Sequence, residues 1–393
     1  MYSQSFSPKA LYACTTQAER RNSGLKKDDF IDAIGNELGN TIVDGSYRFH
    51  IRQEEDLFLN GRIRRSFSYL CQNLILRKLH KNIKAIYKVQ QADRNTIVSQ
   101  MKILLNENVD MWVVRLDVRH FYESINRMEL LTKLIEDARL SYTSLSLIQS
   151  LFREQVLAVG TGMPRGLGVS AAMSELYMKY FDLTIRRIEG VYYYARFVDD
   201  IIVFCSTGRS MNLVRETAQE GLNSLGLTLN TEKSYTWSST AHGTELVYLG
   251  YAFKKIGGKV DVSIAGKKIN VIKTRLTKSF VRYAKDHNFD MLKMRVKFLT
   301  GNFTLYQADT LLPIRVGLFF NYKQATNTDC LDDLDKYYQK LLHCRTGRLG
   351  SHIAMSKLET KDLEKYSFRF GYENHVNHHF TTDQMDMITK CWL

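Results

Sequence analysis

The pattern of hydrophobic and polar positions predicts a chain that mixes strands and helices. Apolar runs typical of buried strands occupy 111–118, 191–198 and 201–205. Apolar residues recur at helical spacing in 61–88, 93–106, 170–188, 209–226 and 270–286, and 93–106 also fits a strand–helix unit. Strands and helices alternate up to residue 260, whereas helices are expected to dominate from 270 to the end. The pattern therefore predicts an α+β fold.

A tight hairpin is predicted where two of these strands follow each other. The runs 191–198 and 201–205 are separated only by Asp199 and Asp200, and a two-residue connection is typical of a β-hairpin. Turn chemistry alone explains many acidic pairs of this kind. These two like charges, however, lie between apolar residues, and a bound divalent cation would relieve their repulsion.

A third carboxylate belongs to the same argument. Asp117 lies near the end of the run 111–118, and it faces the same point as Asp199 if the two strands are neighbours in one sheet. A few hard oxygen ligands suit Mg²⁺ better than zinc. Two such ions would stabilise the attacking and the leaving oxygen of a phosphoryl displacement. The sequence thus points to metal-assisted phosphoryl transfer.

The positive charge of the chain is concentrated in two segments. Lys and Arg total 55 against 41 Asp and Glu, a formal net charge of +14. Residues 61–92 hold eight basic residues and no acidic one, and residues 266–300 hold ten basic residues against two acidic ones. The rest of the chain is close to neutral. This concentration is typical of surfaces that bind a polyanion, and two solvated helix faces are the alternative.

The segment 270–286 is predicted to be a helix with two different faces. Ile272, Leu276 and Phe280 recur at helical spacing, which predicts a side that packs on a core. Four basic residues recur at the same spacing on another side, namely Arg275, Lys278, Arg282 and Lys285. Basic side chains in such a row suit phosphate contacts, which position a nucleic acid without reading its sequence.

Composition indicates the cellular environment that the protein is expected to occupy. The chain has no apolar stretch long enough to span a membrane, so no membrane partner is expected. Its six cysteines are scattered without a CxxC pair, which disfavours a disulfide framework or a zinc ribbon and fits a reducing cytoplasm.

The order of five short motifs makes a family visible. The motifs are LDVRHFYESI (116–125), GMPRGLGVSAAMSELYM (162–178), RFVDDIIVF (196–204), LTLNTEKS (227–234) and YLGY (248–251). Together they resemble the consecutive palm motifs of reverse transcriptases. PRGLG and FVDD look most like the bacterial antiphage-defence enzymes near the retron and abortive-infection lineages. SQSFSP (3–8) and VGLFFNY (316–322) look like one partner of the type-3 defence system, which pairs two such enzymes with a small RNA.

The resemblance implies a right-hand polymerase with fingers, a βαββ-type palm and a helical thumb. The implied divisions are an N-terminal extension (1–60), fingers (61–110), a palm with an interleaved fingers segment (111–260), and a helical thumb and C-terminal region (261–393). The fingers segment and the thumb are expected to hold a template–primer duplex from opposite sides.

The resemblance also implies roles for individual residues. Asp117 and Asp199 match the two principal ligands of a pair of Mg²⁺ ions, and Asp200 matches a supporting third ligand. Lys233 matches the lysine that protonates the departing pyrophosphate, although a surface lysine is the alternative. Tyr122 matches the aromatic residue that excludes a ribose 2′-hydroxyl, with a palm-core aromatic as the alternative.

Further residues are expected around the incoming deoxynucleoside triphosphate (dNTP). Phe121 adjoins Tyr122, while Arg165 and Gly166 match a loop in which many relatives have glutamine in place of Arg165. Arginine there would contact the triphosphate or the template base. Lys88 and Arg94 lie where relatives place triphosphate-binding cations, a match by position more than by motif.

The function implied is RNA-directed DNA synthesis in antiphage defence, with dNTPs as substrates and an RNA template and a DNA product as nucleic-acid partners. A small non-coding RNA and a second reverse transcriptase are the further partners implied, and an oligomer is compatible with the sequence. Two alternatives stay open: a template-independent DNA polymerase of the abortive-infection type, and a non-catalytic nucleic-acid scaffold. The three aspartates and Lys233 argue against the scaffold.

Overall fold

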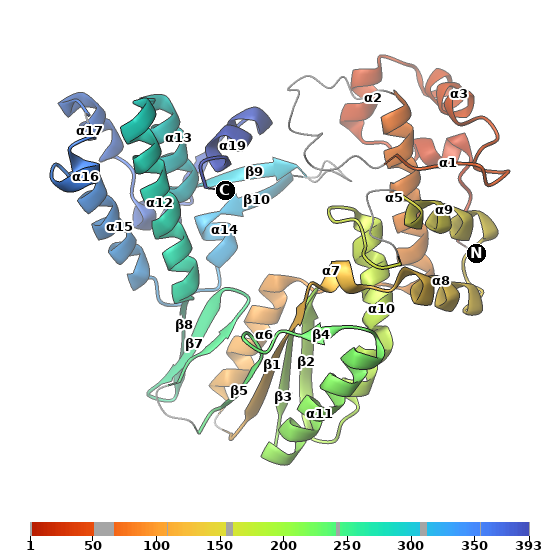
Figure 1. The fold of residues 1–393 in the computed structure, drawn as a ribbon, viewed down its shortest axis with the longest axis horizontal. Helices are drawn as coiled ribbons and strands as arrows, with labels where there is room; N and C mark the ends of the chain where they lie inside the picture. Colours follow the sequence, from red (N-terminus) through yellow and green to blue (C-terminus); the bar gives the residue numbers. More distant parts are fainter. Residues whose placement is uncertain are drawn as a thin grey trace. The chain divides into compact units, whose positions relative to one another are not determined.

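The chain folds into two compact units. The computed structural model describes residues 2–50, 67–107, 109–154, 160–240, 244–306, 313–353 and 355–392. Unit 1 comprises residues 1–93 and 110–240, and unit 2 comprises 94–109 and 241–393 (Figure 1). These boundaries differ from the predicted divisions, because residues 94–109, predicted in the fingers, belong to unit 2. Residues 241–260, predicted in the palm, also belong to it.

Unit 1 is built on an antiparallel sheet. Its strands are β1 (Trp112–Arg119), β2 (Val191–Phe197), β3 (Asp200–Cys205), β4 (Thr228–Leu229) and β5 (Tyr235–Ser238). The order is β2-β3-β1-β4, and β5 also pairs with β1. The predicted hairpin is confirmed by the pairing of β2 with β3, although its turn is formed by Val198 and Asp199 and Asp200 already belongs to β3. β1 lies directly beside β3.

Helices of unit 1 pack on this sheet and on one another. α10 (Gly168–Arg186) contacts α5 (Phe67–Tyr87), α11 (Gly208–Ser224) and β2, and α11 also contacts β1 and β3 (Figure 1). Their buried side chains belong to one hydrophobic core with those of the sheet. The remaining helices of unit 1 are α1 (Pro8–Tyr12), α2 (Gln17–Ser23), α3 (Lys27–Leu38), α7 (Phe121–Ser124), α8 (Arg127–Glu136) and α9 (Tyr142–Phe152).

The predicted polyanion surface at 61–92 needs correction. Residues 61–66 lie outside the described residues, and two basic side chains of α5 are buried. Arg77 is 8% exposed and bonds Glu19 through both terminal nitrogens, at 2.8 and 2.9 Å. Lys78 is 7% exposed and donates to the carbonyl of Ser3 at 2.8 Å. These two charges therefore hold the N-terminal segment, since buried cations require partners inside the protein.

Unit 2 combines two small sheets with helices. One sheet has the order β6-β7-β8, from β6 (Leu246–Tyr248), β7 (Tyr251–Ile256) and β8 (Lys259–Ile264), and Gly257 and Gly258 form the turn between β7 and β8. The other has the order β10-β9-β11, from β9 (Asn302–Tyr306), β10 (Pro313–Gly317) and β11 (Asn377–His378). After residue 300 the chain therefore contains three short strands that the expectation of a mainly helical region did not include.

Several helices of unit 2 contribute side chains to a second hydrophobic core, namely α12 (Gly266–Asp286), α13 (Phe289–Thr300), α14 (Leu318–Tyr322), α15 (Asp329–Leu342), α16 (Gly347–Gly350), α17 (Lys357–Leu363) and α18 (Phe368–Glu373). Unit 2 also contains α6 (Arg94–Asn106) and α19 (Thr382–Thr389). α12 has the predicted two faces: Leu276 and Phe280 are fully buried, whereas Arg275, Lys278 and Lys285 are exposed. Over the described residues, no helix combines the length and apolar character needed to cross a membrane.

Candidate active site

The register of β1 against β3 brings two of the predicted aspartates together. Asp117 is directly opposite Asp200 in this antiparallel pair, and directly opposed residues place their side chains on the same face of a sheet. Asp117 is only 3% exposed. The two carboxylates therefore share one face at the end of the pairing, next to the turn that connects β2 and β3.

The turn itself brings Asp199 to the same place. Val198 has a φ of +60°, a left-handed conformation that is rare for a β-branched residue. The carbonyl of Asp199 accepts a hydrogen bond from the backbone N–H of Val118 at 3.1 Å. This bond ties the turn to β1 directly beyond Asp117, so Asp199 adjoins Asp117.

Charge repulsion is concentrated at these aspartates. Burial raises the pKa of Asp199, and the neighbouring charge of Asp117 raises it further. Burial likewise raises the pKa of Asp200; Arg115 opposes this effect, and the charge of Asp199 adds to it. Carboxylates whose pKa is raised by burial and by a neighbouring carboxylate favour positive charge nearby.

Lys233 supplies positive charge to Asp117. Its Nζ lies 3.2 Å from both carboxylate oxygens of Asp117. Two further bonds hold the loop after β4 in place: Asn230 donates its N–H to the carbonyl of Asp117 at 2.7 Å, and Ser234 accepts from the N–H of Asp117 at 3.0 Å. The side chain of Lys233 is still 48% exposed, so it can also reach a substrate.

Arg115 is a residue of the site that the sequence reasoning missed. Its Nη2 lies 3.3 Å from Oδ1 of Asp200, and its guanidinium lies 5.7 Å from the centre of the Tyr235 ring. Arg115 precedes Asp117 by two residues on β1, so both point to the same face. A basic residue inside an otherwise apolar strand was the signal that could have identified it.

Tyr122 lies beside the aspartates, and Phe121 lies in the core. α7 begins after His120, which has a φ of +47°. Tyr122 is half-buried; burial raises its pKa, and the charge of Asp199 contributes to the rise. Phe121 is 3% exposed and meets the Tyr122 ring edge to face at 5.6 Å. Phe121 therefore supports Tyr122 from the core side.

The loop that carries Arg165 and Gly166 lies against α7. Met163 donates its N–H to the carbonyl of Tyr122 at 2.8 Å. Arg165 forms an ion pair with Glu123 at 2.6 Å, and its guanidinium lies 5.9 Å from the centre of the Tyr122 ring. Gly166 has a φ of +80°, which L side chains rarely adopt. The sequence reasoning did not find Glu123, which adjoins Tyr122 in the chain.

The two predicted fingers cations occupy different settings. Lys88 is exposed, directly follows α5, and lines a cavity of about 400 Å³ together with Glu175 and Asp182 of α10. Arg94 belongs to unit 2, where its Nε donates to the carbonyl of Leu249 at 3.1 Å. Its guanidinium also lies 5.0 Å from the centre of the Tyr251 ring. The contacts of Arg94 thus hold the YLGY segment.

The carboxylate oxygens of this site suit magnesium, although two of the three aspartates are paired with basic side chains. Asp117 contacts Lys233, and Asp200 contacts Arg115. Over the described ranges, no three His, Cys, Asp or Glu side chains are grouped as metal ligands. The carboxylate oxygens of Asp117 and Asp199 are nevertheless the hard donors that Mg²⁺ prefers, and a cation bound there would oppose the burial and the charge of Asp117 that raise the pKa of Asp199.

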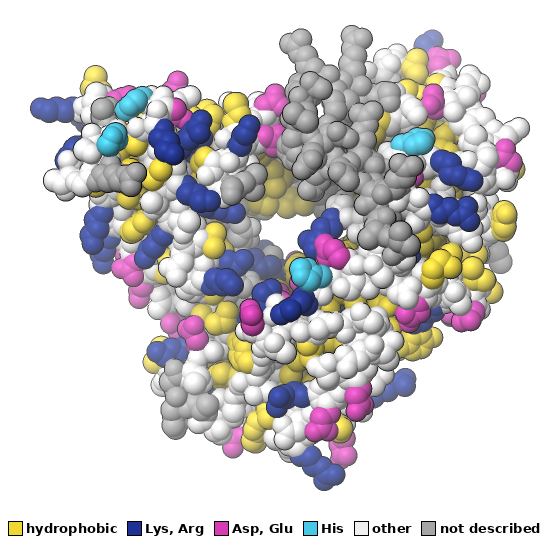
Figure 2. Space-filling view, in the orientation of Figure 1, with side chains coloured by type: hydrophobic (Ala, Val, Ile, Leu, Met, Phe, Trp, Pro, Cys, Tyr) yellow, Lys and Arg dark blue, Asp and Glu magenta, His cyan; other side chains and the backbone are white. Residues whose placement is uncertain are grey.

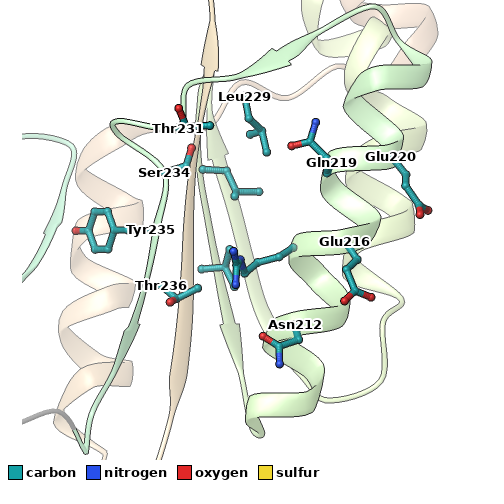
Figure 3. A pocket seen from close by; sticks show the side chains of 12 residues that line it. Asn212, Glu216, Gln219, Glu220, Leu229, Thr231, Ser234, Tyr235 and Thr236 are labelled. Carbon is teal, nitrogen blue, oxygen red and sulfur yellow. The ribbon is translucent and has the colours of Figure 1, made fainter.

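A large cavity of unit 1 lies on the other face of the sheet. It measures about 790 Å³ and is bounded by α11, β1 and the segment around β5 (Figure 3). Val114 and Leu116 of β1 line it, and they alternate with Arg115 and Asp117 along the strand. The cavity is therefore separate from the aspartates, although Thr231 and Ser234 at its edge flank the loop of Lys233.

Comparison with known proteins agrees with the motifs. Residues 61–253 match the reverse transcriptase (RNA-dependent DNA polymerase) family. Apo telomerase from Candida tropicalis, truncated from its C-terminal domain, aligns with a TM-score of 0.39 and 15% identity over 53% of this chain and 50% of that one. Telomerase from Candida albicans in complex with a TWJ fragment of telomeric RNA aligns with a TM-score of 0.37 and 10% identity. This alignment covers 81% of this chain and 53% of that one.

The chain spans about half the length of these telomerase chains. No curated protein gave a significant match. The family match covers all five motifs, from LDVRHFYESI (116–125) to YLGY (248–251).

Proposed function

From the match of residues 61–253 to the reverse transcriptase family, we propose that the chain copies RNA into DNA. The reaction transfers a dNTP to the 3′-hydroxyl of a primer and releases pyrophosphate. The observation that carries this proposal is the grouping of Asp117, Asp199 and Lys233 at one end of the β1–β3 pair, with Tyr122 beside them.

Asp117 and Asp199 would hold the metal ions, and Asp200 would support them. Magnesium, when bound there, supplies the positive charge that acidifies the primer hydroxyl and stabilises the triphosphate. Arg115 holds Asp200 by an ion pair at 3.3 Å. Asp200 thus has Arg115 as its own cation partner, whereas Asp117 is paired with the exposed ammonium of Lys233, which can also reach a substrate.

The other side chains bind and orient the substrates. Lys233 donates a proton to the departing pyrophosphate, because an ammonium offers both charge and a proton to that oxygen. The ring of Tyr122 fills the space beside C2′ of the sugar and excludes a ribose hydroxyl. Arg165, held by Glu123 at 2.6 Å, contacts the triphosphate or the template base.

Unit 2 contributes a basic surface for nucleic acid. Exposed basic residues follow one face of α12, namely Lys267, Lys268, Arg275, Lys278, Arg282 and Lys285. Figure 2 shows Lys and Arg side chains gathered over this part of unit 2. Such a row suits the phosphates of a template–primer duplex, and binding of this kind weakens as salt rises because counterions are released.

The biological role we propose is antiphage defence in the cytoplasm, with a small non-coding RNA and a second reverse transcriptase as partners. The support is the sequence resemblance in PRGLG (164–168), FVDD (197–200) and the two flanking segments at 3–8 and 316–322. Phage plating on cells that carry the wild-type gene or its Asp199→Asn variant, each with its neighbouring genes, tests the role. Equal plating on both strains would contradict it.

The polymerase activity is tested by nucleotide incorporation. Purified protein is given Mg²⁺ and each dNTP singly or all four together, before and after ribonuclease treatment. We expect synthesis that needs several dNTPs and is lost after ribonuclease. Sequencing of nucleic acid that co-purifies with the protein then identifies the template. Extension with a single dNTP after ribonuclease would instead indicate a template-independent polymerase, and no incorporation by wild-type protein would contradict both.

A further inference from the structure

Arg196 is a buried arginine that directly precedes the FVDD turn. It lies on β2 and is 5% exposed. A guanidinium has five N–H donors, and each of them has an acceptor. Nε donates to Asp182 at 2.9 Å, Nη2 to Asp182 and Glu175 at 2.8 and 2.7 Å, and Nη1 to Glu175 and the carbonyl of Val198 at 3.3 and 3.1 Å.

Helix α10 supplies both carboxylates of this network. Glu175 and Asp182 are seven residues apart, which places them two turns apart on the same side of the helix. Tyr194 precedes Arg196 by two residues on β2, so both side chains point the same way. The hydroxyl of Tyr194 also donates to Asp182, at 2.6 Å. The network therefore fixes the end of β2 against α10.

The fifth bond of Arg196 reaches the strained part of the turn. Val198 has a φ of +60°, and a β-branched residue keeps such a conformation only when its surroundings hold it there. The Val198 carbonyl is held by Arg196 on one side of the turn, and the Asp199 carbonyl is held by the N–H of Val118 on the other. Consecutive carbonyls are thus anchored to α10 and to β1.

We propose that Arg196 is a positioning residue: by holding the Val198 carbonyl against α10, it fixes the turn that carries Asp199. Arg196 does not touch substrate and acts only through the backbone of the turn. The kinetic consequences of this inference rest on the proposed polymerase function. The effect of Arg196 on the conformation of the turn does not depend on that function.

The alternative is that Arg196 is only a buried ion pair that stabilises the fold. Unit 1 offers a matched control for that alternative. Arg77 is also buried, also bonds a carboxylate through both terminal nitrogens, and also donates to a backbone carbonyl, that of Cys14 at 3.3 Å. Its contacts are with the N-terminal segment, not with the turn.

The test compares Arg196→Lys with Arg77→Lys in the full chain. A lysine keeps the charge but has only three donors on one nitrogen, so it cannot bridge two carboxylates and a carbonyl in the same way. For Arg196→Lys we expect kcat to fall about 10- to 100-fold, as for residues that orient metal ligands, while KM for dNTP changes less than about 2-fold. Arg77→Lys should lower the melting temperature comparably and leave kcat near wild type.

Hydrogen exchange gives a readout that does not depend on activity. In Arg196→Lys, amides of a peptide covering 197–202 should exchange faster than in wild type, whereas in Arg77→Lys they should not. Equal exchange in the two variants, or equal kcat values, would overturn the proposal. If wild-type protein shows no synthesis, the proposed function fails, but exchange at the turn still decides whether Arg196 holds it.

A second variant covers the case in which Arg196→Lys does not fold. Asp182→Asn keeps the shape of the side chain and removes one of the two carboxylates that orient Arg196. It should accelerate exchange at 197–202 and lower kcat by a smaller factor than Arg196→Lys. Faster exchange at 197–202 together with a lower kcat supports the proposal, and wild-type values of both overturn it.

Discussion

The ammonium of Lys233 lies 3.2 Å from each carboxylate oxygen of Asp117. The lysine that we propose to act on pyrophosphate therefore also neutralises a residue that we propose as a metal ligand. Because a cation held by Asp117 would compete with this ammonium, the loop of Lys233 is expected to respond to metal binding. The hydrogen bonds of the Asn230 N–H and the Ser234 hydroxyl to the backbone of Asp117 keep that loop close to the strand.

Substitution of Lys233 separates its two roles. Lys233→Ala removes both the proton donor and the charge on Asp117, so kcat should fall about 100-fold or more, while the Mg²⁺ concentration needed to raise the melting temperature should decrease. Lys233→Arg keeps the charge but is a far weaker acid, so kcat should fall with little change in the Mg²⁺ requirement. A wild-type kcat in both variants would show that Lys233 is only a surface lysine.

Asp199→Asn tests the metal assignment. The change removes a charged ligand and keeps the size of the side chain, so Mg²⁺-dependent dNTP incorporation should fall about 1000-fold or more. Binding of a template–primer duplex, measured by fluorescence anisotropy, should largely persist because the basic face of α12 is intact. Asp333→Asn, an exposed aspartate of α15, is the control and should behave as wild type. Unchanged synthesis in Asp199→Asn would refute the assignment.

The raised pKa of Asp199 predicts a pH-dependent gain in stability for the same variant. Burial and the charge of Asp117 raise this pKa, so the folded protein binds the proton more tightly than the unfolded chain. The stability contributed by the protonated carboxyl is present below about pH 3.9, the unfolded value, and is lost as pH rises through the folded pKa. In metal-free protein at neutral pH, Asp199→Asn should therefore raise the melting temperature.

That gain should shrink as pH is lowered towards 4, since wild-type Asp199 then becomes protonated as well. Differential scanning fluorimetry in the presence of a chelator measures both trends, with Asp333→Asn as the control. A melting temperature of Asp199→Asn that equals wild type at every pH would show that Asp199 carries no repulsive charge. Added Mg²⁺ should stabilise wild type more than the variant, because only a ligand that binds the folded state raises its stability.

The local part of the site could be predicted from the sequence. The apolar run at 111–118 placed Asp117 on a strand, and the two-residue gap placed Asp199 in a hairpin turn. The structure confirms both elements through the β1–β3 and β2–β3 pairings. These features depend on residues that are close in the chain, where periodicity carries the information.

Features that depend on distant residues could not be predicted in the same way. The burial of Arg77 follows from Glu19, which a basic helix pattern does not reveal. β9 was missed because its partners, β10 and β11, are short, and β11 follows only after several helices. Arg115 and Arg196 were visible as basic residues inside apolar strands, but their carboxylate partners lie elsewhere in the sequence.

Tyr122 should decide the choice of sugar. Its ring is half-buried next to the aspartates, so Tyr122→Val or Tyr122→Ala opens space beside C2′. The preference for dNTP over rNTP, measured as the ratio of kcat/KM values, should fall about 10- to 100-fold, the range expected when a pocket stops rejecting one small group. Tyr142→Ala, at a position that is 78% exposed, is the control. An unaltered ratio in the Tyr122 variants means that the ring only packs in the core.

The basic face of α12 should contribute to duplex binding through charge alone. Lys267 and Lys285 lie on this face and are exposed, so Lys267→Gln with Lys285→Gln should weaken binding of unrelated duplex sequences equally. Each lost phosphate contact should reduce the slope of log K against log salt by about 0.9 for a B-form duplex. Lys357→Gln with Lys361→Gln removes the same charge from α17 of the same unit. If both double variants lower the slope equally, net charge and not the α12 face determines binding.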